Sequence, residues 1–207
     1  MRTYMWKKLE IALLLALAAT LLWGAASLHR QETLSRKMIR LHVIANSDSA
    51  EDQALKLEVR DKVLNFTTNV LQRSVDMEDA QMQLQDALDR IENIAQREIV
   101  NQGYDYPVTA QLTRTEFPLK EYDGFSLPAG EYMALRLVIG EGAGQNWWCV
   151  VYPPLCTAAA TDMPETAIRA GLSGDDVSLI TEEDAGYVLK FRSLELWEQL
   201  RQWLRKK

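Results

Sequence analysis

Residues 39–64 read IRLHVIANSDSAEDQALKLEVRDKVL, and this stretch decides the fold because it contains a change from strand to helix. Its first part alternates in character and predicts a short strand over Ile39–Ala45. The polar run that follows ends the strand, and Ser49 is placed to cap a helix with Asp52 at the third helical position. Apolar residues then recur at helical spacing, which predicts a helix to about Gln72: Leu55, Val59, Val63, Phe66 and Val70.

A second helix is expected to begin at Asp76 and to end at Gly103, a residue type that commonly terminates helices. Its apolar stripe consists of Ala80, Leu84, Ala87, Leu88, Ile91, Ile94, Ala95 and Ile99. The two helices form a hairpin whose apolar stripes must be buried against another element.

Three extended segments follow and supply that element: VTAQLTRTEF after Pro107, EYMALRLVIG from Glu131, and WWCVVY from Trp147. The order predicts an α+β domain with an antiparallel or mixed sheet of about four to five strands and the two-helix hairpin on one face. YVLKFR from Tyr187 adds a last strand, and Ser193 caps a C-terminal helix that runs to Leu204.

The chain therefore divides into four parts. Residues 1–29 are a signal peptide or membrane anchor, and residues 37–156 are the α+β domain. Residues 157–186 are small, acidic and without periodicity, which predicts a flexible linker or long loop. Residues 187–207 hold the terminal strand and helix.

The N-terminus carries a membrane signal. The run from Ile11 to Leu28 contains no charged residue and follows the basic residues Arg2, Lys7 and Lys8. Its length is borderline between a spanning helix and the core of a signal peptide, and small residues near Gly24 offer a cleavage site. The sequence thus predicts export from the cytoplasm and leaves cleavage open.

The exported part is acidic. The chain has a formal charge of −6, to which the residues before Ile11 contribute +2, so the remainder carries −8. Such a domain is a poor partner for nucleic acid or for an anionic membrane surface.

Two cysteines, Cys149 and Cys156, flank VVYPPL. Outside the cytoplasm this pair can form a disulfide, since the two prolines turn the chain between them, but two buried thiols fit the spacing as well. The neighbourhood has too few ligands for a metal site.

We find no catalytic, cofactor-binding or metal-binding set. Beyond the membrane segment, His42 is the only histidine, and it shares a strand face with Arg40 and Ile44. A structural or surface role is the better interpretation, with Asp48 or Asp52 as possible partners, because no serine or cysteine can be assigned to complete a triad. GEGAG at residues 140–144 is followed by a strand pattern, so a hairpin turn is favoured over a phosphate loop.

The run Gln145-Asn146-Trp147-Trp148 is more informative. Adjacent strand residues point to opposite faces, so the two tryptophans cannot enter the same core. One of them is expected to be exposed, as in a protein interface or a sugar platform, or to be covered by residues 157–186.

Several longer segments of the sequence resemble a known family. IRLHVIANSDSAEDQALKLEVRDKVL, YPVTAQL, LPAGEYMALRLVIGEGAGQNWWCVVYPPLC and KFRSLELWE together resemble the stage II sporulation protein R family. The resemblance covers residues 37–156 and the last strand and helix, and it does not include residues 157–186.

The resemblance implies a signal without enzymatic activity, no cofactor and no small-molecule substrate. Such proteins are exported from the forespore into the space between the two membranes, where they activate a membrane-embedded aspartic protease that processes the mother-cell sigma factor precursor. Chemistry and spacing, not the resemblance, select our candidates for contact with the protease: His42, Asn46, Asp48, Gln145, Asn146, Trp147 and Trp148.

Two rival functions remain at this level. The two tryptophans and the expected location outside the cytoplasm fit a cell-wall-associated carbohydrate-binding or hydrolytic module. A hydrolase requires two placed carboxylates, however, and Glu131 and Glu141 stand about 33 Å apart on an extended strand. A purely structural, membrane-anchored protein is the third possibility.

Overall fold

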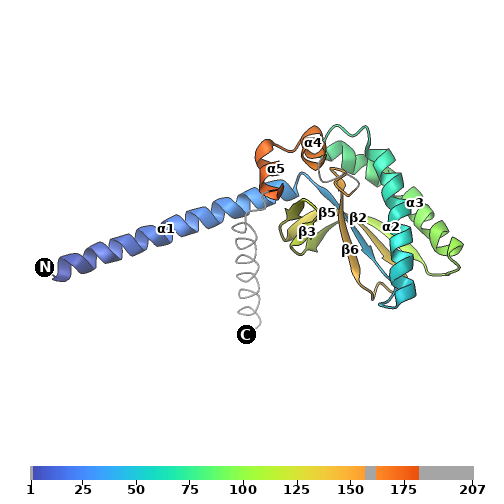
Figure 1. The fold of residues 1–207 in the computed structure, drawn as a ribbon, viewed down its shortest axis with the longest axis horizontal. Helices are drawn as coiled ribbons and strands as arrows, with labels where there is room; N and C mark the ends of the chain where they lie inside the picture. Colours follow the sequence, from blue (N-terminus) through green and yellow to red (C-terminus); the bar gives the residue numbers. More distant parts are fainter. Residues whose placement is uncertain (1, 157–161, 182–207) are drawn as a thin grey trace. The chain divides into compact units, whose positions relative to one another are not determined.

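The computed structural model describes residues 2–156 and 162–181, which form an α+β protein (Figure 1). The chain separates into two compact units, Met1–Leu34 and Ser35–Lys207. The predicted terminal strand and helix over residues 187–207 lie outside the described residues.

The first unit is the greater part of a single helix, α1 (Arg2–Ser35). Its segment Trp6–Ser35 is long and apolar enough to cross a membrane, with a mean hydropathy of 2.2 over its most apolar window. A signal sequence satisfies the same criterion, so the helix fits both of the fates expected for residues 1–29.

The second unit is built on a mixed four-stranded sheet with the order β2-β5-β1-β6. Its strands are β1 (Ile39–Ile44), β2 (Val108–Phe117), β5 (Gly130–Ile139) and β6 (Asn146–Tyr152). The central strand β1 pairs in parallel with β5 and antiparallel with β6, while β2 pairs antiparallel with β5. Both faces of β1 are covered, and all six of its residues are buried.

Helices α2 (Ala50–Leu71) and α3 (Met77–Asn101) cover one face of this sheet (Figure 1). Each begins where the sequence predicts, because a side-chain oxygen accepts from an amide left unpaired in the first turn. Ser49 accepts from the Asp52 amide, and Asp76 from the Asp79 amide. Gly103 has a φ of +85° just beyond α3, a conformation that glycine adopts without strain.

The main core lies between these helices and the sheet. Alternate residues of the strands contribute one side of it and the predicted apolar stripe of α3 the other. Its fully buried members include Leu41, Val43, Val59, Val63, Leu84, Ile91, Ile99, Leu135 and Leu137.

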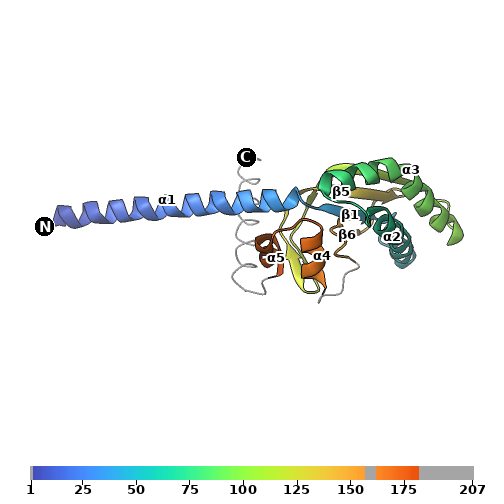
Figure 2. The same ribbon diagram turned by 90° about the horizontal axis from the view of Figure 1, so that it is seen from above.

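The opposite face of the sheet carries a second layer, which the sequence did not predict. A small hairpin, β3 (Lys120–Tyr122) and β4 (Phe125–Leu127), is followed later in the chain by α4 (Met163–Arg169) and α5 (Gly174–Thr181). Helix α5 packs on β4, and Figure 2 shows α4 and α5 away from α3.

The prediction of a segment without regular structure over residues 157–186 is wrong where the structure describes it, since α4 and α5 lie there. Ser173 and Asp176 form a reciprocal cap at the start of α5: the Asp176 amide donates to Ser173 Oγ, and the Ser173 amide to Asp176 Oδ2. Lys37 also binds Asp176 and ties this helix to the residues before β1.

The prediction of a hairpin turn at residues 140–144 is also wrong. Strands β5 and β6 do not pair, because β1 lies between them, so the loop crosses the end of β1. The amides of Ala143 and Gly144 donate to the carbonyls of Asn46 and Ala45, both at 3.0 Å. A β-carbon on Gly144 would lie 2.1 Å from the Ser47 carbonyl oxygen.

Replacing Gly144 by alanine tests this close crossing. The new methyl group forces the loop away from β1, and we expect the free energy of unfolding to fall by about 1–3 kcal/mol, as in other overpacked sites. Gly174→Ala is the matched control, since nothing lies within 4 Å of its β-carbon position. Urea unfolding of the full chain in detergent measures both, and an equal stability of the two variants would contradict the crossing geometry.

Candidate functional site

The turn between β1 and α2 is organised around the carboxylate of Asp52. Its Oδ2 accepts from Asn46 Nδ2 at 2.8 Å and from Ser47 Oγ at 2.6 Å, while its residue is only 4% exposed. Burial by itself would raise the pKa of Asp52, but the hydrogen bonds from Ser47, Asn46 and Tyr106 outweigh burial and lower it. The buried charge therefore holds residues 46–49 in one conformation.

The crossing loop is attached to this turn from the other side. Asn46 Oδ1 accepts from the Glu141 amide at 3.0 Å, and Lys56 Nζ donates to the Gln145 carbonyl at 3.0 Å. Burial is the main cause that lowers the pKa of Lys56, and Arg60 adds to it. Helix α2 thus positions both the turn after β1 and the residue that precedes β6.

His42 and Trp148 lie against each other on the sheet face away from α2 and α3. Their rings stack with centroids 3.9 Å apart, and Phe117 packs on both. His42 Nε2 donates to Asn146 Oδ1 at 2.7 Å, since the amide oxygen can only accept. The His42 side chain is structural, as one of the two interpretations predicted, and its residue is only 5% exposed.

The pKa of His42 is lowered. Burial is the largest cause, and the positive charges of Arg136 and Arg40 add to it, while the hydrogen bond with Asn146 opposes the shift. The imidazole is therefore neutral in the folded protein over a wider pH range than in the unfolded chain.

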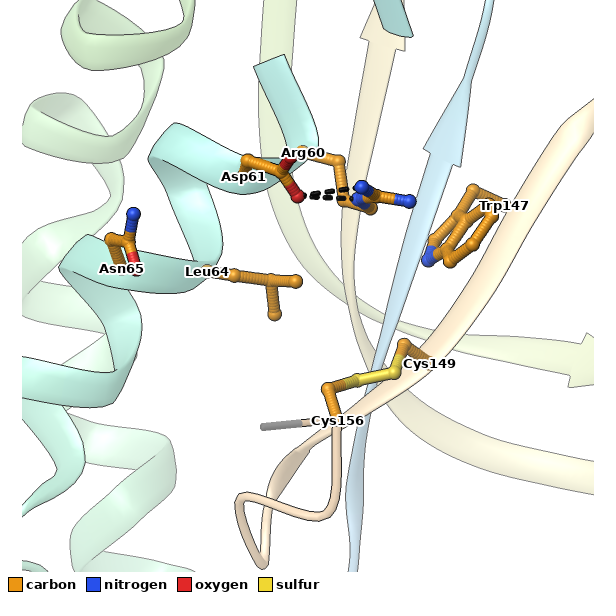
Figure 3. A pocket seen from close by; sticks show the side chains of 7 residues that line it. All are labelled: Arg60, Asp61, Leu64, Asn65, Trp147, Cys149 and Cys156. Carbon is orange, nitrogen blue, oxygen red and sulfur yellow. Dashed lines mark hydrogen bonds and ion pairs between the residues drawn. A yellow bond between two sulfur atoms is a disulfide. The ribbon is translucent and has the colours of Figure 1, made fainter. Parts of the chain in front are cut away.

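Trp147 projects to the other face of β6, as the alternation predicts. The guanidinium carbon of Arg60 lies 4.2 Å from the centroid of its ring. Beside it an open hollow of about 440 Å³ separates α2 from β6 (Figure 3). The hollow is lined by Arg60, Asp61, Leu64, Asn65, Trp147, Cys149 and Cys156. Neither tryptophan is fully exposed, and the described side chains that cover them come from α2, β1 and β2.

Cys149 and Cys156 form a disulfide in the structure, with Cα atoms 5.9 Å apart. The turn between them contains a cis peptide bond before Pro153 and returns the chain to β6. The disulfide lies at one end of the hollow (Figure 3).

A fully buried arginine is the feature that sequence reasoning missed. Arg40 is 0% exposed, its Nη2 donates to the Tyr122 hydroxyl at 2.7 Å, and its guanidinium carbon lies 4.0 Å from the Phe117 ring centroid and 4.8 Å from that of Tyr132. Its Nε and Nη1 have no hydrogen-bond partner among the described residues. The Asp123-Gly124 dipeptide, which lies between β3 and β4, is typical of hairpin turns. It could have predicted the hairpin that supplies Tyr122 to Arg40.

The structure brings the predicted candidate residues together at one end of the sheet. Ile44 and His42 of β1 stand opposite Asn146 and Trp148 of β6, and the Gln145 carbonyl accepts from the Ala45 amide at 3.5 Å. The side chains form two groups: His42 and Trp148 on one face, and Trp147 on the other, beside the hollow. Asp48, Gln145 and Asn146 are exposed at the rim.

His42 Nε2 donates its proton to the Asn146 amide oxygen, so this ring nitrogen is not available as a general base. Within residues 2–156 and 162–181, no group of three or more histidine, cysteine or acidic side chains is placed to hold a metal ion.

Comparison with known proteins identifies the family. A family model described as stage II sporulation protein R matches residues 35–162, more than half of the chain. The chain belongs to the stage II sporulation protein R family. This confirms the resemblance in the sequence, and the matched residues include every candidate described above.

A curated relative, the stage II sporulation protein R of Bacillus subtilis (strain 168), is 38% identical over 118 residues. The alignment covers 57% of this chain and 53% of the relative, so the chain corresponds to about half of the relative's length. No solved structure matches the chain.

The lowered pKa of His42 predicts an acid-dependent loss of stability. As pH falls from 7 to 5, the unfolded chain binds a proton at this residue near pH 6.5, before the folded chain does, so the free energy of unfolding decreases. His42→Phe keeps an aromatic ring against Trp148 and removes the titration. Urea unfolding at both pH values should show a smaller decrease for this variant, and an identical decrease would contradict the assignment to His42.

Loss of the disulfide has a calculable effect. The loop between Cys149 and Cys156 is short, and opening it should lower the free energy of unfolding by about 2.5 kcal/mol in the chain-entropy model. We expect the Cys149→Ala/Cys156→Ala variant to unfold at lower urea concentration than the oxidised protein. Addition of a reductant should destabilise the wild-type chain and leave the variant, which has no cysteine, unchanged; a wild-type chain whose stability does not respond to the reductant would refute the assignment.

Proposed function

We propose that this chain is an exported sporulation signalling protein that activates a membrane-embedded aspartic protease and thereby leads to processing of the mother-cell sigma factor precursor. The observation that carries the proposal is the family match over residues 35–162. The apolar helix α1 supports it, because a signal that acts across an intermembrane space must first cross or enter a membrane.

We further propose that the end of the sheet formed by the β1–α2 turn and the start of β6 contacts the protease. Asp52 and Lys56 hold this surface in one conformation, which lowers the entropic cost of binding. Exposed polar side chains at the rim surround half-buried tryptophans, the composition common in protein interfaces. The candidate contacts of this surface are Asn46, Asp48, Gln145, Asn146, Trp147 and Trp148, while the buried His42 would hold Trp148 and Asn146 in place.

The carbohydrate-binding alternative has weaker support. A sugar platform needs an open aromatic face, whereas the Trp148 ring is stacked on His42 and the Arg60 guanidinium lies over the Trp147 ring. Each tryptophan thus has one face occupied by another side chain. The surface therefore fits contact with a protein better than a flat platform for sugars.

Precursor processing in sporulating cells tests the proposal. Cells that lack this chain should accumulate the unprocessed sigma factor precursor, because the protease is not activated. A version in which residues 1–29 are replaced by an efficiently cleaved signal peptide should restore processing if the released domain is the signal. Immunoblots of the precursor measure both, and normal processing without the chain would refute the function.

The same assay tests the proposed surface. Asp48→Lys reverses a charge on the exposed turn and should reduce processing about tenfold, if it weakens binding by about 1.4 kcal/mol. Asp89→Lys makes the same change on the exposed side of α3 and should leave processing at the wild-type level. Equal effects of the two substitutions would exclude the turn as a contact.

A further inference from the structure

Strand β6 lies at the edge of the sheet, with β1 on one side only. An edge strand exposes the N–H and C=O groups of every second residue, and a second extended chain can pair with these groups. The groups that point outward in β6 can be identified from the hydrogen bonds at its two ends.

Val150 defines the outward side. Its carbonyl accepts from the Cys156 amide at 3.4 Å, and its amide donates to Cys156 Sγ at 2.9 Å, so both groups point away from β1. Gln145, at the other end, directs its carbonyl inward to the Ala45 amide. Because backbone groups alternate along an antiparallel strand, those of Asn146 and Trp148 also point outward.

The outward N–H and C=O groups of Val150 are hydrogen-bonded to Cys156, in the turn that the disulfide attaches to β6. Within the described part of the chain, no backbone hydrogen bond outside the strand ladders engages Asn146 or Trp148. Among the described residues, the part of the edge without a backbone partner is therefore Asn146–Trp148, with the disulfide turn at one end and the crossing loop at the other. We call this segment the free edge.

A binding site for side chains lies beside this free edge. The hollow between α2 and β6 is lined by Trp147, whose side chain projects from the middle of the free segment, and by Leu64 and the disulfide (Figure 3). A strand added to the edge would direct alternate side chains to the two faces of the sheet. One of them would reach this hollow and another the side of Trp148.

We propose that an extended segment of the partner protein adds to the sheet as a short strand along Asn146–Trp148 and places one apolar side chain in the hollow. The inference rests on the proposed function, since the partner is the protease that the chain activates. The free edge is continuous with the candidate surface, because Asn146, Trp147 and Trp148 belong to both. Main-chain pairing supplies affinity in this mode of recognition, and the hollow supplies specificity.

A second copy of the chain fits this edge less well. In a symmetric antiparallel pair, the residues before Asn146 of one copy would run toward the disulfide turn of the other. Those residues cannot bend away, since Ala143 and Gly144 are hydrogen-bonded to the end of β1. A flexible segment of another protein can enter and leave the free edge between the two obstacles.

Proline at residue 146 tests the pairing. Asn146→Pro removes an outward N–H without removing a hydrogen bond to β1, and proline is tolerated at such edge positions. Asn146→Ala is the matched control, because it also loses the side-chain bond to His42 but keeps the N–H. We expect precursor processing in sporulating cells to fall at least tenfold for proline relative to alanine, at equal amounts of exported protein.

Hydrogen exchange on the wild-type full chain provides a measurement that does not depend on a variant folding. In detergent, the amides of Asn146 and Trp148 should exchange at least tenfold more slowly when the purified full-length protease is added. Unchanged exchange at both amides would overturn the proposal, as would equal processing with proline and alanine. Slowing that depends on the concentration of the chain alone would assign the edge to a second copy and overturn it as well.

These outcomes separate the inference from the function on which it rests. If cells without the chain still process the precursor, the proposed function itself fails. If processing requires the chain and the proline variant matches the alanine variant, only the pairing at the edge fails.

Discussion

The position of β1 between β5 and β6 is the constraint on which the second unit depends. Because β1 lies between β5 and β6, these two strands are not adjacent and cannot be joined by a tight turn. The chain from β5 to β6 must therefore cross the end of β1. The crossing is close enough that Gly144 has no room for a side chain beside Ser47. Asp52 and Lys56 of α2 complete it by binding the turn and the loop. The candidate surface is formed by this crossing.

The two faces of β1 are packed against different kinds of side chain. Toward α2 and α3 the sheet presents aliphatic side chains, and their burial supplies most of the hydrophobic stabilisation of the unit. On the other face Arg40 and His42 are buried among aromatic rings. A buried guanidinium loses its hydration, and the rings of Phe117 and Tyr132 and the hydroxyl of Tyr122 offset part of that cost. This face consequently requires the β3–β4 hairpin.

The start of β6 links the fold to the proposed signalling role. Three consecutive residues have three different environments: Asn146 binds His42, Trp147 lies beside the hollow, and Trp148 stacks on the imidazole. The turn closed by the disulfide covers the edge beyond them, so within residues 2–156 and 162–181 only this segment of the edge is unpaired. In the proposed complex, backbone pairing at this segment and a few neighbouring side chains would recognise the partner.

Sequence alone determined the features that depend on neighbours along the chain. The caps at Ser49 and Asp76, the stripe of α3, the opposite faces of Trp147 and Trp148, the apolar N-terminal helix and the family phrases all follow from local chemistry and spacing. Tertiary structure decided what depends on strand order. Local spacing carries no information on whether β5 and β6 are adjacent, so the glycine-rich segment between them predicts a hairpin turn where the structure has a loop that crosses the end of β1. For the same reason, the sequence does not predict the burial of Arg40, the helices within residues 157–186 or the free edge at Asn146–Trp148. Each of these depends on residues that are distant in sequence and come together only when the sheet is assembled.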